Sequence, residues 1–67
     1  MAISYKKLWI MLIEKDLKKT DLKALCKISS NTLARLGKNE AVSMDALQRI
    51  CQSLQCDIGD IVEYILD

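Results

Sequence analysis

The sequence contains no histidine, no proline and no phenylalanine, and it has only two glycines. Without histidine the chain lacks the commonest zinc ligand and the usual general base near neutral pH, which argues against an enzyme and against a zinc site. Gly37 and Gly59 stand far apart, so no glycine-rich loop is present to cradle a nucleotide phosphate. We therefore expect no catalytic site, no metal and no other cofactor.

The three cysteines, Cys26, Cys51 and Cys56, are an odd number without CxxC spacing, and no disulfide framework is expected. The sequence also lacks an apolar run of the roughly 18 residues that a membrane span needs, since the longest run covers residues 8–13. Nothing at the N-terminus resembles a secretion signal. These absences predict a cytoplasmic protein.

The composition, 51% hydrophobic and 28% charged over 67 residues, is typical of one small folded domain covering residues 1–67. Its charge is divided unevenly along the chain. Residues 1–39 carry nine basic and three acidic side chains, a net charge of +6, whereas residues 40–67 carry Arg49 and six acidic side chains, a net charge of −5. This division favours binding of a polyanion by the basic part, with an ordinary solvated surface as the alternative.

Abundant Leu, Lys and Ala, with apolar residues three and four positions apart, predict an all-α bundle of five helices without any strand. The expected N-caps are Ser4, Thr20, Ser29, Ser43 and Asp57. The expected helices cover residues 5–16, 20–26, 29–37, 44–54 and 58–65, and Gly37 is expected to end the third.

The apolar face of the first helix is expected to contain Tyr5, Leu8, Trp9, Leu12 and Ile13. Both aromatic side chains on this face are therefore predicted to lie in the core rather than against a nucleobase. The cysteines are likewise expected to be small buried hydrophobic residues rather than a redox sensor.

The most informative pattern lies in residues 19–36, where two short helices are joined by about three residues, the spacing of a helix-turn-helix. On the second of these helices Leu33 and Leu36 face inward. The outer face carries Ser30, Asn31, Ala34 and Arg35. Asn can pair with adenine, Arg with guanine, and a methyl group can contact thymine, so this face is a candidate for base contacts in a DNA major groove. A solvated helix face is the alternative.

A long stretch of the sequence resembles the Cro/repressor (Xre-like) family of helix-turn-helix DNA-binding domains, namely KTDLKALCKISSNTLARLGKNEAVSMDALQRICQSLQCDIGDIVEYI. The D-L, I-S-S-N-T-L and L-x-K-N-E elements and the D-I-G-D-I-V tail occur in the family order. The resemblance implies a lambda-repressor-like bundle, with residues 20–26 as the positioning helix and residues 29–37 as the recognition helix. It also implies that Lys19, Ser30, Asn31 and Arg35 touch operator DNA. The residues expected at phosphates are Lys19, Thr20, Lys27, Lys38 and Asn39.

Two lysines depart from the family pattern. Lys23 stands where the family commonly has a small residue between the two helices, so its stem is expected to turn outward. Lys27 stands at the turn, where the family favours glycine because a positive φ is often needed. Both lysines add positive charge next to the expected DNA face.

These observations predict a sequence-specific DNA-binding regulator, a repressor of phage, plasmid or mobile-element type that occupies a two-fold symmetric operator as a weak homodimer. The apolar residues that the core pattern does not use form the candidate dimer patch: Ile10, Met11, Tyr64 and Leu66. The alternative is a protein-interaction module, an antitoxin or adaptor, that binds its partner through the acidic C-terminal part. No membrane or small-molecule partner is expected.

Overall fold

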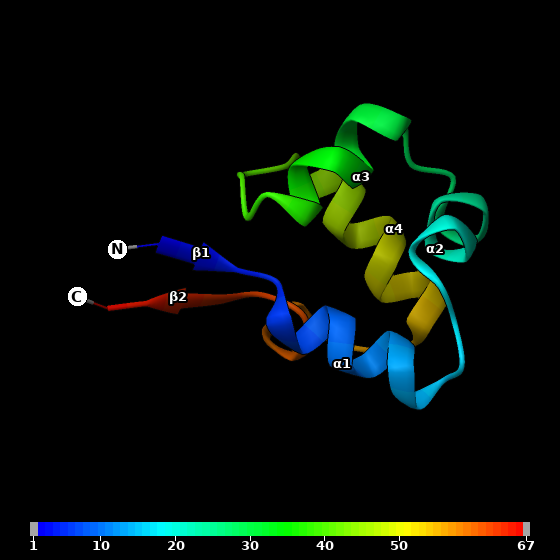
Figure 1. The fold of residues 1–67 in the computed structure, drawn as a ribbon, viewed down its shortest axis with the longest axis horizontal. Coiled ribbons are helices and arrows are strands. Elements are labelled where there is room, and N and C mark those ends of the chain that lie inside the picture. Colours follow the sequence, from blue (N-terminus) through cyan, green and yellow to red (C-terminus); the bar gives the residue numbers. More distant parts are fainter. Residues whose placement is uncertain (1, 67) are drawn as a thin grey trace.

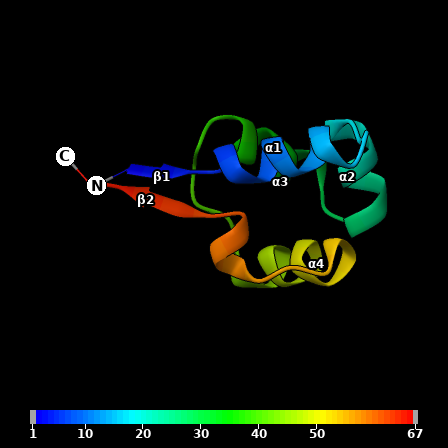
Figure 2. The same ribbon diagram turned by 90° about the horizontal axis from the view of Figure 1, so that it is seen from below.

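The computed structural model describes residues 2–66, which form four α-helices, one short 3₁₀ helix and a two-stranded sheet (Figure 1). The elements follow in the order β1 (Ala2–Ser4), α1 (Lys6–Glu14), α2 (Lys19–Cys26), α3 (Ser30–Gly37), α4 (Met44–Leu54), η1 (Ile58–Asp60) and β2 (Glu63–Ile65). The helices pack together, and the two strands project side by side from one end of them (Figures 1 and 2). No helix in this part of the chain is long and apolar enough to cross a membrane.

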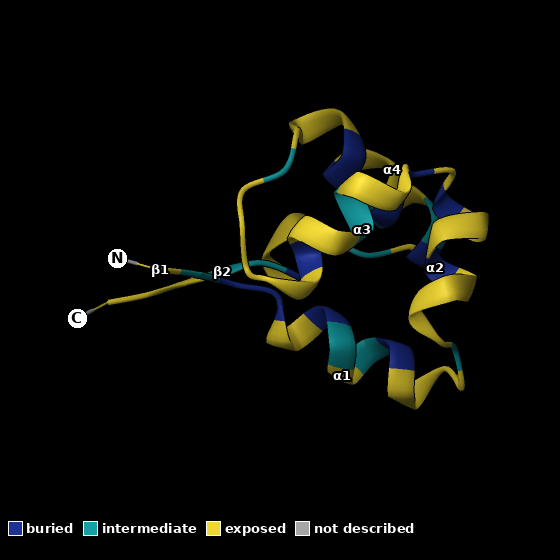
Figure 3. Ribbon diagram, turned by 45° about the horizontal axis from the view of Figure 1, so that its top comes forward, coloured by how far each residue is buried: buried dark blue, intermediate teal, exposed yellow. Residues whose placement is uncertain are grey.

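One hydrophobic core joins all four α-helices to the C-terminal segment. The side chains with less than 2% exposure are Tyr5, Leu8, Leu22, Leu36, Ile50 and Ile61. Buried positions recur along each helix between exposed ones (Figure 3). Full burial of a Leu or Ile side chain contributes about 1.5–3 kcal/mol, so these contacts hold the short helices in place.

The predicted apolar face of α1 is partly wrong. Leu8 and Leu12 are buried and Trp9 packs against the core half-buried, but Ile13 is 73% exposed. A helix turns by about 100° per residue, so the Ile13 side chain points roughly 120° away from the direction midway between Leu8 and Leu12, which faces the core. Met11 packs against the core instead, although the sequence pattern had left it outside.

The cysteines lie where the sequence predicts. Cys26 is buried, while Cys51 and Cys56 are half-buried against the core, and all three are free thiols. Burial raises the pKa of each thiol above its ordinary value. The thiols therefore stay protonated near neutral pH, as small apolar side chains do.

The prediction of a fifth helix, and with it of an all-α fold, is wrong. Asp57 acts as a cap, since its carboxylate accepts a hydrogen bond from the Ile58 N–H at 2.8 Å, but only the single turn of η1 follows. The chain then extends into β2, which pairs antiparallel with β1 so that Ile3 lies opposite Tyr64. β-Branched residues crowd the end of the sequence and favour a strand once a partner strand is present.

Three of the five predicted N-caps hold, namely Asp57, Ser29 and Ser43, and two do not. Ser29 Oγ accepts a hydrogen bond from the Thr32 N–H at 3.0 Å, and Ser43 Oγ accepts one from the Ala46 N–H at 3.1 Å. Ser4 belongs to β1, and Thr20 lies inside α2, which begins one residue earlier. The Asp21 carboxylate accepts a hydrogen bond from the backbone N–H of Lys18, the residue just before α2. The start of α2 is therefore stabilised by an acidic side chain inside the helix and not by Thr20.

Each of the four α-helices is followed within two residues by a residue with positive φ that is not glycine: Asp16, Lys27, Asn39 and Gln55, with φ between 53° and 57°. After each, the next backbone N–H donates to a carbonyl five residues earlier, as the Cys56 N–H does to the Cys51 carbonyl at 3.0 Å. This is the Schellman arrangement, in which glycine is the usual residue. Gly37 is the last residue of α3, as expected, but its φ is not positive, and Asn39 takes the left-handed position two residues later.

We expect Gln55→Gly to stabilise the protein by about 0.5–1 kcal/mol, because glycine adopts positive φ without the steric cost of a Cβ. The matched control is Gln52→Gly, an exposed position inside α4, which should lose about 1 kcal/mol because glycine weakens a helix interior. Urea unfolding of both variants measures the difference. Destabilisation by both substitutions would contradict the strain assigned to Gln55.

Candidate nucleic-acid interface

The turn between α2 and α3 has the geometry of a helix-turn-helix. Lys27 adopts φ 55°, which confirms the prediction of positive φ at this place. Ile28 is buried in the core, and Ser29 caps the start of α3 through its hydrogen bond to Thr32. A single left-handed residue, one apolar anchor and one cap therefore set the direction in which α3 leaves α2.

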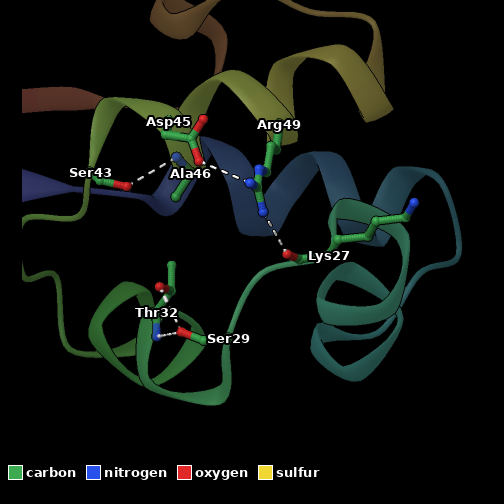
Figure 4. A network of polar contacts seen from close by, with 7 residues as sticks. All are labelled: Lys27, Ser29, Thr32, Ser43, Asp45, Ala46 and Arg49. Atoms are coloured by element: carbon green, nitrogen blue, oxygen red, sulfur yellow. Dashed lines mark hydrogen bonds and ion pairs between the residues drawn. The ribbon is translucent and has the colours of Figure 1, made fainter.

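Arg49 of α4 braces this turn from outside the two helices. Its guanidinium donates to the backbone carbonyl of Lys27 at 3.0 Å, and Nη2 lies 3.2 Å from Oδ2 of Asp45 (Figure 4). The spacing of Asp45 and Arg49, four residues apart, was the available signal for the ion pair. The contact with Lys27 joins residues 22 positions apart, and no sequence pattern indicates it.

The outer face of α3 is confirmed as a solvent-facing surface. The four residues predicted for it are all exposed: Ser30, Asn31, Ala34 and Arg35. On the opposite side Leu36 is fully buried and Leu33 packs half-buried against the core. Asn31 and Arg35 also border a shallow polar hollow of about 260 Å³ between α3 and the loop that leads to α4.

Lys19 and Thr20 occupy the exposed first turn of α2. The ammonium of Lys19 lies 4.4 Å from the centre of the Trp9 ring of α1, a cation–π contact. The sequence pattern had assigned Trp9 to the core alone, but its half-exposed ring also supports a lysine at the start of α2. Lys23, as expected, turns outward into solvent.

Lys27 is exposed in the turn of the helix-turn-helix and Lys38 is exposed at the end of α3. Asn39 is also exposed, but its side chain is bonded to the start of α1. The side-chain carbonyl of Asn39 accepts a hydrogen bond from the Tyr5 N–H at 3.3 Å, and the Tyr5 hydroxyl donates to the Glu40 carbonyl at 2.7 Å. Burial raises the pKa of Tyr5, so this hydroxyl remains a donor at neutral pH. These two bonds hold the loop after α3 against the start of α1, a role that the sequence did not indicate.

The four residues of the candidate dimer patch fall in two separate places. Ile10 and Met11 border a shallow hollow beside α1, which Asp60 of η1 also lines. Tyr64 and Leu66 lie in β2 and directly after it, in the projecting sheet (Figure 1). The structure therefore divides the predicted patch into a helix surface and a strand surface.

The fold and this site define the class of protein. The family model of the Cro/C1-type HTH DNA-binding domain matches residues 7–67, and the chain belongs to this family. The match confirms the resemblance seen in the sequence and places the chain among helix-turn-helix regulators that bind DNA.

The chain is similar to two known proteins of this class. The chain is 35% identical over 60 residues to YozG of Bacillus subtilis (strain 168), described as an uncharacterized HTH-type transcriptional regulator, and the match covers 87% of this chain and 71% of YozG. It is also similar to the crystal structure of the transcriptional regulator VanUg, with a TM-score of 0.94 and 47% identity, covering 98% of this chain and 88% of VanUg.

We expect Arg49→Met to loosen the turn, because it removes the donor that holds the Lys27 carbonyl while keeping a long apolar stem. Amide hydrogen exchange at Ile28 and its neighbours should become faster, with a loss of about 0.5–1.5 kcal/mol in unfolding free energy. Asp45→Asn is the control, because it removes the ion pair but leaves the bond to Lys27. Equal acceleration at the turn in both variants would show that the ion pair, and not the bond to the turn, matters.

Proposed function

We propose that the chain is a sequence-specific transcriptional repressor of phage, plasmid or mobile-element type. It occupies an operator and thereby excludes polymerase from an overlapping promoter. The observation that carries the proposal is the outer face of α3, where Asn31 and Arg35 are exposed on a helix whose opposite side is fixed by the buried Leu36. A slim helix anchored on one side and polar on the other suits the major groove.

In the proposed complex, base edges are read by Ser30, Asn31, Ala34 and Arg35. The Asn31 amide pairs with adenine and the Arg35 guanidinium pairs with guanine, because each offers two hydrogen-bonding groups in a matching plane. The Ala34 methyl contacts thymine. Ser30 lies in the first turn of α3, the end of a recognition helix that approaches the groove floor.

Phosphate contacts orient the protein on the duplex. In the proposed complex they come from Lys19, Thr20, Lys27, Lys38 and Asn39, which lie at the ends of α2 and α3. The cation–π contact with Trp9 limits the freedom of Lys19, so less conformational entropy is lost when its ammonium meets a phosphate. The excess of basic residues before residue 40 supports the same orientation.

A second chain completes the proposed complex, since one recognition helix reads only a few base pairs. Helix-turn-helix dimers place their recognition helices about 34 Å apart, so the half-sites should be centred about 10 base pairs from each other. We therefore propose a weak homodimer on an inverted repeat.

A protein-interaction module is the second candidate, and one feature favours it. An apolar hollow of about 300 Å³ lies between α4 and η1, bordered by Met44, Leu47, Cys51 and Ile58. Met44 is 68% exposed there, on the acidic half of the chain. An antitoxin or adaptor that used this surface alone would show little dependence of its binding on salt, whereas counterion release makes DNA binding steeply salt-dependent.

Selection of binding sites from random duplexes tests the function directly. We expect an enriched inverted repeat and an affinity that falls steeply with salt. No enrichment over random DNA would contradict the proposal and favour the interaction module.

Arg35→Ala should reduce affinity for the selected site by about 1–3 kcal/mol and relax preference at one or two base positions. Binding to random DNA should change little, because the proposed contact reads a base. Titration of both duplexes with wild type and variant gives the measurement. An equal loss on both duplexes would assign Arg35 to a phosphate instead.

Lys19→Gln and Lys38→Gln should each weaken binding to all sequences alike and reduce the slope of log affinity against log salt by about 1. Lys7→Gln is the matched control, because the Lys7 ammonium donates at 3.2 Å to the carbonyl of Gly59 in η1 and not in α2 or α3. It should leave the slope almost unchanged. Unaltered slopes in the Lys19 and Lys38 variants would remove both residues from the phosphate contacts.

A further inference from the structure

The C-terminal end of α4 brings two cysteines together. Cys51 lies in the last turn of this helix, and Cys56 follows two residues after the helix ends. Gln55, which has φ 53°, turns the chain back so that the Cys56 N–H donates to the Cys51 carbonyl at 3.0 Å. In a Schellman arrangement the side chains at these two positions regularly touch. One residue with positive φ therefore places two thiols side by side.

The two thiols interact directly. Burial raises the pKa of both, and each thiol is also a side-chain hydrogen-bond partner of the other. Both side chains are half-buried against the core, and both sulfur atoms are free. Cys26 is different, because it is 2% exposed on α2 and its thiol has Ser53 as its hydrogen-bond partner. The fold thus separates one buried thiol from a pair in contact.

Solvent reaches one member of the pair. Cys51 borders the hollow of about 300 Å³ between α4 and η1. Met44 and Ile58, on the same border, are 68% and 37% exposed, so the hollow opens to solvent and a small molecule can approach Cys51 from outside. The end of α4 therefore combines an accessible thiol with a second thiol in contact with it, which is the arrangement that thiol–disulfide exchange requires.

We propose that Cys51 and Cys56 form a redox-active dithiol, a modification site whose co-reactant is a small disulfide of the glutathione class. The Cys51 thiolate attacks one sulfur of the small disulfide, so that a mixed disulfide forms and one small thiol leaves. The Cys56 thiolate then attacks the Cys51 sulfur, and the second small thiol leaves. The protein gives up two protons and two electrons, which reduce the small disulfide to two thiols. This reaction does not depend on DNA binding.

Proximity, rather than acidity, makes the pair reactive. Burial and the neighbouring carboxylate of Asp60 raise the pKa of both thiols, so little thiolate is present near neutral pH and the first attack is slow. The second attack joins groups that the fold already holds in contact, and intramolecular steps of this kind proceed as if the reactant were highly concentrated. The mixed disulfide is therefore converted quickly, and the internal disulfide accumulates.

The dithiol stands beside contacts that support the helix-turn-helix. Ser53, between the two cysteines, donates from Oγ to the Leu25 carbonyl of α2 at 3.4 Å, and Arg49 of the same helix holds the Lys27 carbonyl. An internal disulfide encloses the turn at Gln55 in a covalent ring, so the end of α4 opens less readily. Oxidation therefore stabilises the part of α4 that holds the end of α2.

Equilibration of the full chain in glutathione buffers of graded redox ratio tests the site, with remaining thiols trapped by an alkylating reagent. The folded wild type should lose about 2 Da and two of its three thiols, and dithiothreitol should restore both. The same chain in concentrated urea is the reference, because only the connecting residues then hold the pair together. Half oxidation of the folded chain should need a ratio of oxidised to reduced glutathione at least about tenfold lower. By linkage, the disulfide then stabilises the fold by the same factor.

Cys26→Ala is the matched control and should form the same disulfide, because its thiol lies outside the pair. Cys56→Ala should stop at the mixed disulfide and gain the mass of one glutathione, since no second thiol is in contact with Cys51. The inference is overturned if the folded wild type keeps its three thiols in the most oxidising buffer, or if it needs the same ratio as the chain in urea. A disulfide that peptide mapping places at Cys26 or between two chains would overturn it as well.

Discussion

The structure of residues 2–66 depends on one small hydrophobic core, because none of the helices described there is long enough to be stable alone. The α-helices have eight to eleven residues, and isolated helices of this length are unstable in water even with favourable sequences. Each of them contributes at least one fully buried side chain, such as Leu22 from α2 and Leu36 from α3. The direction of every outward-facing residue therefore follows from what its helix buries. On α3, the burial of Leu36 turns Asn31 and Arg35 to the surface.

The helix ends show how the fold accepts local strain. Within residues 2–66, four residues other than glycine adopt positive φ, and each costs on the order of 1 kcal/mol relative to glycine. At Lys27 the cost is offset by a buried Ile28 after it and by the hydrogen bond from Arg49 to its carbonyl. In the proposed complex the same position also brings a positive charge to the DNA backbone. A stabilising glycine there would lose that charge.

The acidic C-terminal half stabilises the basic N-terminal half through a few contacts between distant segments. Arg49 holds the turn of the helix-turn-helix, the Glu40 carbonyl accepts from the Tyr5 hydroxyl, and the Gly59 carbonyl accepts from Lys7.

The family resemblance indicated the positive φ at Lys27. The spacing of residues in the sequence was sufficient to predict the helix-turn-helix, the caps Ser29, Ser43 and Asp57, and the exposed face of α3. These features depend on residues within about one helical turn of each other, so local spacing and capping chemistry determine them. The tertiary structure alone decided that the chain ends in a strand, that Arg49 braces the turn and that Trp9 supports Lys19. Each of these needs a partner distant in sequence: β2 becomes a strand only because β1, at the other end of the chain, supplies the backbone groups that it pairs with.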